Sequence, residues 1–106
     1  MQSQTQATFR ALADPTRRGI LQLLSQSELT IAEVSEAFPM TRAAVKKHLT
    51  ILKEGNLIEV EPRGRERINR LCPNGLQPVT EWLSALDAAW DRRLSALKTA
   101  IEEDKT

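Results

Sequence analysis

Apolar side chains recur at helical spacing in the first part of the chain, and capping residues mark where helices begin. Asp14 stands before Pro15, a pair that favours a helix start because aspartate accepts a hydrogen bond from a free amide while proline has no amide to satisfy. The apolar positions that follow predict a helix running to about Ser25. Upstream, Phe9 and Leu12 predict a shorter first helix.

Two further helices are predicted close together. Thr30 and Glu33 have the spacing of a capping box, and the short helix that they begin must end before Pro39, because proline disfavours helical geometry in the preceding residue. Thr41 offers itself as the next N-cap. The short connection at 38–40 is typical of a helix-turn-helix pair.

The fourth helix has an apolar stripe at Val45, Leu49 and Leu52. Gly55 follows where a left-handed C-terminal residue is expected, so the helix is predicted to end there. With about 3.6 residues in a turn, an inward stripe at these positions directs other side chains outward. The outward residues are Ala43, Lys46, Lys47 and Thr50, with Arg42 beside them.

The pattern then becomes strand-like. Residues 57–61 alternate loosely, residues 62–65 supply a turn, and residues 66–71 return, so we expect a β-hairpin with a basic tip. After Pro73, Gly75 and Pro78 break the pattern, apolar residues recur every three or four positions from Val79 to Ile101, which predicts one long helix. The charged residues 102–106 are expected to be a fraying tail.

The composition and the distribution of charge limit the kinds of function that the chain can have. The chain has 106 residues, of which 41% are hydrophobic and 27% charged, as expected for one globular domain. No apolar run approaches the ~20 residues of a membrane span, and no signal-peptide pattern is present. The lone Cys72 forms no internal disulfide, which favours a reducing cytoplasm. Residues 41–70 hold eight basic and four acidic side chains, although the whole chain has a net charge of only +1.

This basic segment predicts contact with DNA. Small residues allow the fourth helix to approach a groove closely, and lysines beside them neutralise phosphates or reach a guanine edge. Gly64 permits a tight turn whose arginines fit a minor groove or grip phosphates. Each feature alone is more typical of a solvated surface, but their adjacency favours a DNA interface. His48, at the edge of the apolar stripe, is assigned to packing or to a phosphate.

The sequence contains no set of residues suited to catalysis or to metal binding. A zinc site needs three or four ligands, whereas the chain has one histidine and one cysteine. No glycine-rich phosphate loop or nucleophile with its base is present. We therefore expect no catalytic residue, no metal and no cofactor.

Four segments resemble the ArsR family of repressors: residues 11–21, which include Asp-Pro-Thr-Arg-Arg, residues 45–52, residues 55–58 and residues 63–67. The resemblance implies a mainly α-helical winged helix-turn-helix, with the helix-turn-helix at 30–54 and the wing at 57–72 within a single domain, 1–106. It implies DNA contacts by Thr41, Arg42, Ala43, Lys46, Lys47, His48, Arg63 and Arg65. The last helix is most similar to a subgroup that represses without a known metal, in which a tyrosine commonly stands where this chain has Asn69.

The last helix, at 76–103, is expected to form a homodimer. Its apolar stripe is wider than packing on one small core requires, and aromatic residues are common in interfaces. The expected interface residues are Phe9, Leu12, Val79, Trp82, Leu83, Leu86, Trp90, Leu94 and Leu97. A symmetric dimer predicts an inverted-repeat operator in double-stranded DNA and an autoregulating repressor.

Two alternatives keep the same fold. The first is a ligand- or redox-responsive regulator, which would use Cys72 or an apolar pocket near Trp82 and Trp90 at the dimer interface. The second is a winged helix that binds another protein and has no role on DNA.

Overall fold

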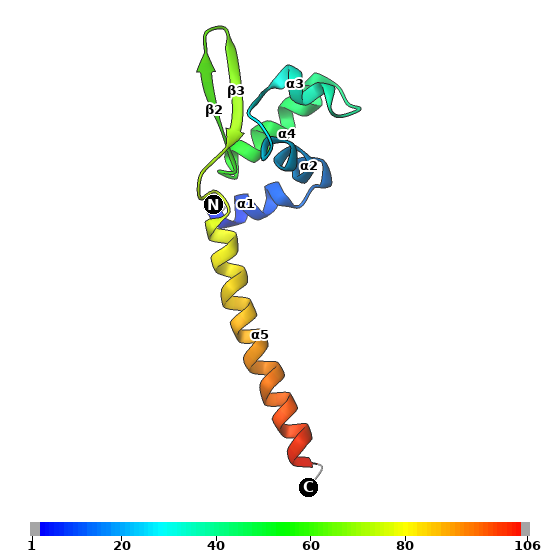
Figure 1. Cartoon of the computed structure of the whole chain (residues 1–106), viewed down its shortest axis with the longest axis vertical. Coiled ribbons are helices and arrows are strands. Elements are labelled where there is room, and N and C mark those ends of the chain that lie inside the picture. The colour runs from blue at the N-terminus through cyan, green and yellow to red at the C-terminus, as the bar shows by residue number, and fades with distance from the viewer. Residues whose placement is uncertain (1–2, 105–106) are drawn as a thin grey trace. The chain divides into compact units, whose positions relative to one another are not determined.

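A computed structural model describes residues 3–104, without the side chain of Asp104, and the chain divides into two compact units after Leu76. The first unit contains α1 (Gln4–Leu12), α2 (Pro15–Leu24), β1 (Leu29–Thr30), α3 (Ile31–Glu36), α4 (Arg42–Glu54), β2 (Ile58–Arg63) and β3 (Glu66–Leu71). The second unit is the helix α5 (Gln77–Asp104). Figure 1 labels these elements.

The expected N-caps begin their helices. The Asp14 carboxylate accepts from the backbone amide of Arg17 at 3.0 Å at the start of α2. Thr30 and Glu33 form the reciprocal capping box of α3, with bonds of 3.2 and 2.9 Å. Thr41 accepts from the Ala44 amide at 3.1 Å and caps α4. Each cap satisfies an amide that has no partner within its helix.

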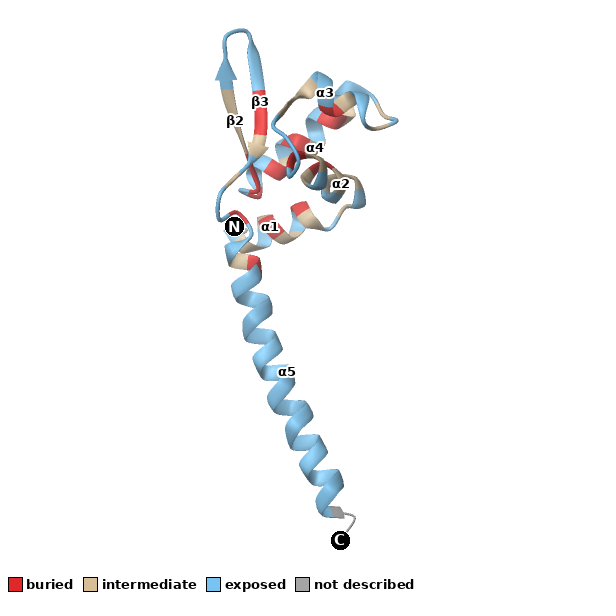
Figure 2. Cartoon of the chain, in the orientation of Figure 1, coloured by how far each residue is buried: buried red, intermediate tan, exposed pale blue. Residues whose placement is uncertain are grey.

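The core of the first unit lies around α4, which contacts α1, α2, α3 and β2. The stripe at Val45, Leu49 and Leu52 is buried as the spacing predicts, together with Ile20 of α2 and Val34 of α3. Figure 2 shows buried residues interspersed with exposed ones along α3 and α4. The fourth helix is therefore held on its apolar side and leaves its basic side to solvent.

The sheet has three strands in the order β1-β3-β2, one more than the expected hairpin. The strand β1 has only two residues, too few for an alternating pattern, and it pairs with Asn69 and Ile68 of β3. The turn is also shorter than expected, because Pro62 and Arg63 belong to β2 and only positions 64–65 lie between the strands. Pro62 is tolerated because β2 is an edge strand.

The left-handed residue after α4 is Asn56, with φ of 59°, and not Gly55, whose φ is −77°. The expectation for Gly55 was wrong because its role is close packing. A Cβ built there would lie 2.9 Å from the Cβ of Ala11 and 3.0 Å from the carbonyl oxygen of Ala7. Asparagine tolerates the left-handed conformation better than most residues.

Two arginines of the Asp-Pro-Thr-Arg-Arg segment join α1 to α2. The Arg17 guanidinium donates to the carbonyl oxygens of Ala11 at 2.8 Å and Arg10 at 2.9 Å, and Arg18 donates to that of Leu12 at 2.8 Å. The last carbonyls of α1 have no partners within the helix, so these bonds complete its C-terminal end.

The helix α5 has 28 residues and continues through Asp104, close to the expected range of 76–103, so residues 102–104 of the expected charged tail belong to the helix. Residues 105–106 lie outside the described part of the chain. Figure 2 shows α5 exposed over nearly all its length. Among the described residues, no helix has the length and apolar character needed to cross a membrane.

Candidate nucleic-acid interface

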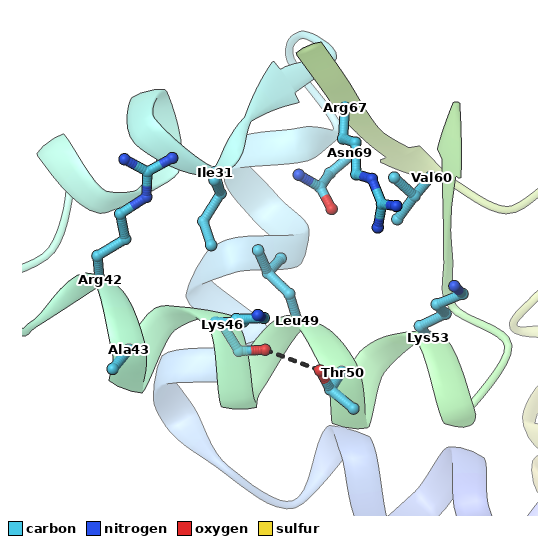
Figure 3. A pocket seen from close by; sticks show the side chains of 10 residues that line it. All are labelled: Ile31, Arg42, Ala43, Lys46, Leu49, Thr50, Lys53, Val60, Arg67 and Asn69. Carbon is cyan, nitrogen blue, oxygen red and sulfur yellow. Dashed lines mark hydrogen bonds between the residues drawn. The ribbon is translucent and has the colours of Figure 1, made fainter. Parts of the chain in front are cut away.

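The exposed side of α4 lines a hollow of about 530 Å³ in the first unit. Figure 3 shows the hollow between α4, the start of α3 and the strands β2 and β3. The residues that α4 contributes are Arg42, Ala43, Lys46, Leu49, Thr50 and Lys53, which repeat at helical spacing along one face. The hydroxyl of Thr50 donates to the carbonyl oxygen of Lys46 at 3.0 Å, which is the dashed line in Figure 3.

The opposite side of the hollow comes from the wing, which we define as β2, β3 and the turn between them. Val60 and Asn69 are cross-strand partners and therefore lie on one face of the sheet. Arg67, two residues before Asn69, lies on the same face and lines the hollow with them. In Figure 3 the Arg67 guanidinium points into the space above α4.

Lys53 and Arg67 were missed as candidate residues in the sequence. Lys53 is seven residues beyond Lys46, a spacing that returns to the same helix face. Arg67 and Asn69 are two residues apart on β3 and therefore share a face of the strand, but the sequence does not show that this face is turned toward α4 until the strand register is known. Both basic side chains are exposed and line the hollow together with Lys46.

Three other candidates on α4 have different surroundings. Lys47 is exposed but does not line the hollow. His48 is half-buried, and its Nδ1 lies 3.4 Å from Nη1 of Arg17 on α2. Thr41 is exposed, and its hydroxyl is used in capping α4.

The two candidate arginines at the wing tip have unequal environments. Arg63 forms ion pairs with Glu28 at 2.9 Å and Glu61 at 2.8 Å, and these hydrogen bonds, first that to Glu61, raise the pKa of its guanidinium. Its side chain is nevertheless 54% exposed. Arg65 is exposed in the turn after Gly64, whose φ is +61°, and no side-chain partner is seen for it among the described residues.

A second hollow extends the first toward the wing tip. It has a volume of about 640 Å³ and shares Ile31, Arg42 and Arg67 with the first. Arg65 lines it, together with the acidic residues Glu33 and Glu66. The two hollows therefore form one concave surface that runs from α4 to the turn of the wing, with basic side chains along it.

Asn69 lines the first hollow, whereas Cys72, just after β3, lines neither hollow. Asn69 is only 4% exposed, and its side-chain amide donates to the carbonyl oxygen of Leu29 at 3.2 Å. The asparagine thus holds β1 against β3. Cys72 is half-buried, with its Sγ 3.7 Å from Oδ1 of Asn56 and 3.9 Å from Oε2 of Glu59.

The apolar residues of α5 are largely exposed in the single chain. Trp82 is 51% exposed, Trp90 is 61% exposed and Leu94 is 53% exposed. Leu83, Leu86 and Leu97 are also exposed, whereas Val79 is buried. In α1, Phe9 and Leu12 are half-buried, and Leu12 packs against the core.

Comparison with known proteins gives consistent similarities. The family described as a helix-turn-helix domain matches residues 12–61. The chain is 34% identical over 96 residues to the HTH-type transcriptional regulator Rv2034 of Mycobacterium tuberculosis. The matched region covers 91% of this chain and 87% of that protein. Further relatives are named transcriptional repressors.

Solved structures show the same fold. An ArsR-like transcriptional regulator from Rhodococcus sp. RHA1 is 33% identical, with a TM-score of 0.79 over 91% of each chain. The NMR structure of the homodimeric winged helix-turn-helix DNA-binding domain of Mb0332 from Mycobacterium bovis is 26% identical, with a TM-score of 0.63 over 86% of this chain and 82% of that one. Regulators of this kind are not enzymes, in agreement with the expectation from the sequence. The similarity in sequence and in fold shows that this chain belongs to the ArsR family of transcriptional regulators.

Proposed function

We propose that this chain represses transcription by binding double-stranded DNA, with α4 as the helix that enters the major groove. The observation that carries the proposal is the single face of α4 on which Arg42, Ala43 and Lys46 follow one another, with Lys47 beside them. A major groove admits an α-helix, and small and basic residues at its start suit close approach to base edges and phosphates. Thr41 and His48 flank this face and complete the proposed contacts of α4.

The wing is proposed to contact the DNA beside the major groove, either at the phosphate backbone or in the minor groove. Arg65 stands in an exposed turn, and Arg67 lies between that turn and α4. Arginine suits both phosphates and a narrow minor groove because its guanidinium stays charged and offers several donors. Arg63 is proposed to contribute less than Arg65, because its donors already bind two carboxylates.

We infer that the active form is a homodimer joined through α5 and α1. The exposed apolar residues of α5 support this, since single domains rarely leave a continuous apolar stripe in water. The homodimeric state of the structurally similar domain from M. bovis gives further support. A two-fold dimer would present two copies of α4 to half-sites about 34 Å apart, so the proposed operator is an inverted repeat.

The proposed regulator works without a metal and in the cytoplasm. Each chain has one histidine and one cysteine, and no group of three His, Cys, Asp or Glu side chains that could hold a metal ion is found among its described residues; both observations support this. The cytoplasmic location follows from the proposed binding to DNA. Control of its own operon is the simplest arrangement for such a repressor. The first test therefore uses the DNA upstream of the protein's own gene.

The test is a titration of the upstream region of the protein's own gene, followed by fluorescence anisotropy at several salt concentrations. The wild-type protein is expected to bind tightly and to lose affinity steeply as salt rises, because phosphate contacts release counterions. Lys46→Ala and Lys47→Ala are each expected to weaken binding and to reduce the salt slope by about one.

Arg92→Ala is the matched control, because Arg92 is an exposed cation on α5, away from the apolar stripe. It removes the same charge and is expected to change the affinity little. Equal losses for Arg92→Ala and Lys46→Ala would contradict the proposed interface. Absence of binding by the wild-type protein to this DNA and to unrelated DNA would contradict the proposed function.

A further inference from the structure

The hollow between α4 and the wing is large enough to hold a small organic molecule. Its volume of about 530 Å³ lies within the range of about 300–1,000 Å³ that ligand sites occupy. Residues from α3, α4, β2 and β3 line it, so it belongs to the packed part of the first unit and not to a loop. Figure 3 shows side chains from these elements converging on one space.

The floor of this hollow is apolar. Ile31 of α3, Leu49 of α4 and Val60 of β2 contribute to it. Ile31 and Val60 are half-buried, and Leu49 retains 7% exposure, whereas Val45 and Leu52 on the same helix are fully buried. A phosphate backbone gains nothing from such a floor, because apolar side chains offer it neither charge nor hydrogen bonds. An apolar molecular body gains by covering it.

The rim of the hollow is cationic. Arg42, Lys46, Lys53 and Arg67 line it, and none of the four is seen in an ion pair with a carboxylate within the part of the chain that the structure describes. This distinguishes them from Arg63 and Arg70, whose charges are compensated by Glu28, Glu59 and Glu61. An uncompensated cationic rim around an apolar floor selects an anion with an apolar body.

We propose that this hollow binds a small organic carboxylate with an apolar ring or chain, and that the bound carboxylate excludes DNA. The apolar body rests on Ile31, Leu49 and Val60, and the carboxylate takes hydrogen bonds from Arg67 and Lys46. The exclusion of DNA rests on the proposed function, because the same cations would meet phosphates. The ligand would therefore act as an inducer that competes at the DNA surface itself, unlike one held at the dimer interface.

The first experiment is a methyl NMR titration of the wild-type protein with 1-naphthoate, which combines fused rings with a carboxylate. Two controls separate the two parts of the ligand: 1-naphthalenemethanol keeps the rings without the charge, and sodium sulfate supplies charge without the rings. Saturable shifts at the methyl groups of Ile31, Leu49 and Val60 are expected with naphthoate only. Absence of these shifts, or shifts confined to the leucines of α5, would overturn the proposal.

A pair of wing variants tests the rim. Arg67 lines this hollow and Arg65 does not, although both are exposed arginines of the wing. Arg67→Ala is expected to weaken naphthoate binding roughly tenfold, the loss typical of one charge-assisted hydrogen bond. Arg65→Ala is expected to keep the wild-type affinity for naphthoate. Equal affinities of the two variants would overturn the assigned rim.

Competition with DNA tests the consequence. At ten times its Kd, naphthoate is expected to raise the apparent Kd for DNA by at least about tenfold, because one occupant excludes the other. An unchanged DNA affinity at saturating naphthoate would overturn the competition. DNA binding without naphthoate binding would overturn this inference alone, whereas naphthoate binding by a protein that binds no DNA would overturn the proposed function and leave the hollow as a ligand site.

Discussion

The hydroxyl of Thr8 donates to the carbonyl oxygen of Gly55 at 2.8 Å, and this buried bond joins α1 to the end of α4. Thr8 is fully buried, and its hydroxyl oxygen also lies 2.9 Å from the carbonyl oxygen of Gln4, so its single proton is shared between the two carbonyl oxygens. Beside it, Gly55 has no space for a side chain because Ala7 and Ala11 lie against it. The C-terminal end of the helix proposed to read DNA is therefore fixed by the first helix of the chain.

Gly55→Ala is expected to destabilise the fold by about 1–3 kcal/mol, the usual cost of overpacking a tight contact. Its φ of −77° suits alanine, so the loss would come from the contact at 2.9 Å with Ala11 and not from backbone strain. Urea unfolding at neutral pH measures the change. Thr8→Val serves as the comparison, because it leaves the Gly55 carbonyl without its donor and is expected to cost about 1–3 kcal/mol by a different mechanism. An unchanged or raised stability for Gly55→Ala would contradict the packing argument.

The wing arginines give a second prediction. Arg65→Ala is expected to weaken DNA binding and lower the salt slope by about one, as the loss of one phosphate contact should. Arg63→Ala is expected to have a smaller effect, because the ion pairs to Glu28 and Glu61 must be loosened before Arg63 meets DNA. Anisotropy titrations of both variants against salt measure the difference.

Glu28→Gln is the complementary variant, since it removes a carboxylate from Arg63 without changing the side-chain shape much. It is expected to tighten DNA binding, both by releasing Arg63 and by removing a negative charge near the phosphates. Weaker binding by Glu28→Gln would indicate that the ion pair positions Arg63 for DNA instead of withholding it.

Features set by neighbouring residues were predictable from the sequence. Asp14, Thr30 and Thr41 cap their helices through bonds that span three residues, so the spacing in the sequence contains the whole interaction. The apolar stripe of α4 was predictable for the same reason, because helix geometry fixes which positions share a face. These features give the order of the helices and the exposed basic side of α4.

Features set by distant partners were not predictable. The strand β1 exists because β3 lies beside it, and two residues show no periodicity of their own. Gly55 is the C-cap of α4 but not its left-handed residue, and the atoms that leave it no space for a side chain belong to α1, more than forty residues earlier. The lining of the hollow likewise depends on the strand register that pairs Val60 with Asn69. Because this register is not visible in the sequence, Arg67 could not be assigned to the hollow beforehand.

From the two capping carboxylates we predict that the stability of the fold depends on pH. Hydrogen bonds from the backbone, above all from Arg17 to Asp14 and from Thr30 to Glu33, lower the pKa of both carboxyl groups from their ordinary values of 3.8 and 4.5. A lowered pKa in the folded state means that the charged form favours folding. The stabilisation is complete above these ordinary values and is lost as the pH falls through the lowered ones.

The double variant Asp14→Asn with Glu33→Gln isolates this effect, because both replacements keep a hydrogen-bond acceptor but do not titrate. Urea unfolding midpoints at about pH 6 and about pH 3 are the measurement. The wild-type protein is expected to lose more stability over this interval than the variant. Equal losses would show that other carboxylates dominate the response to acid.

The exposed stripe of α5 gives the last prediction. Leu94 is 53% exposed in the single chain, so Leu94→Glu leaves the fold of each chain intact but places a charge where the proposed partner helix packs. The dimer dissociation constant is expected to rise roughly a hundredfold or more, as measured by sedimentation equilibrium. Because two half-sites bound together gain affinity from their linkage, DNA binding is expected to weaken as the dimer separates. Arg92→Glu introduces the same side chain on the other face of α5 and is expected to remain dimeric. If Leu94→Glu stays dimeric, the two chains must associate through a different surface.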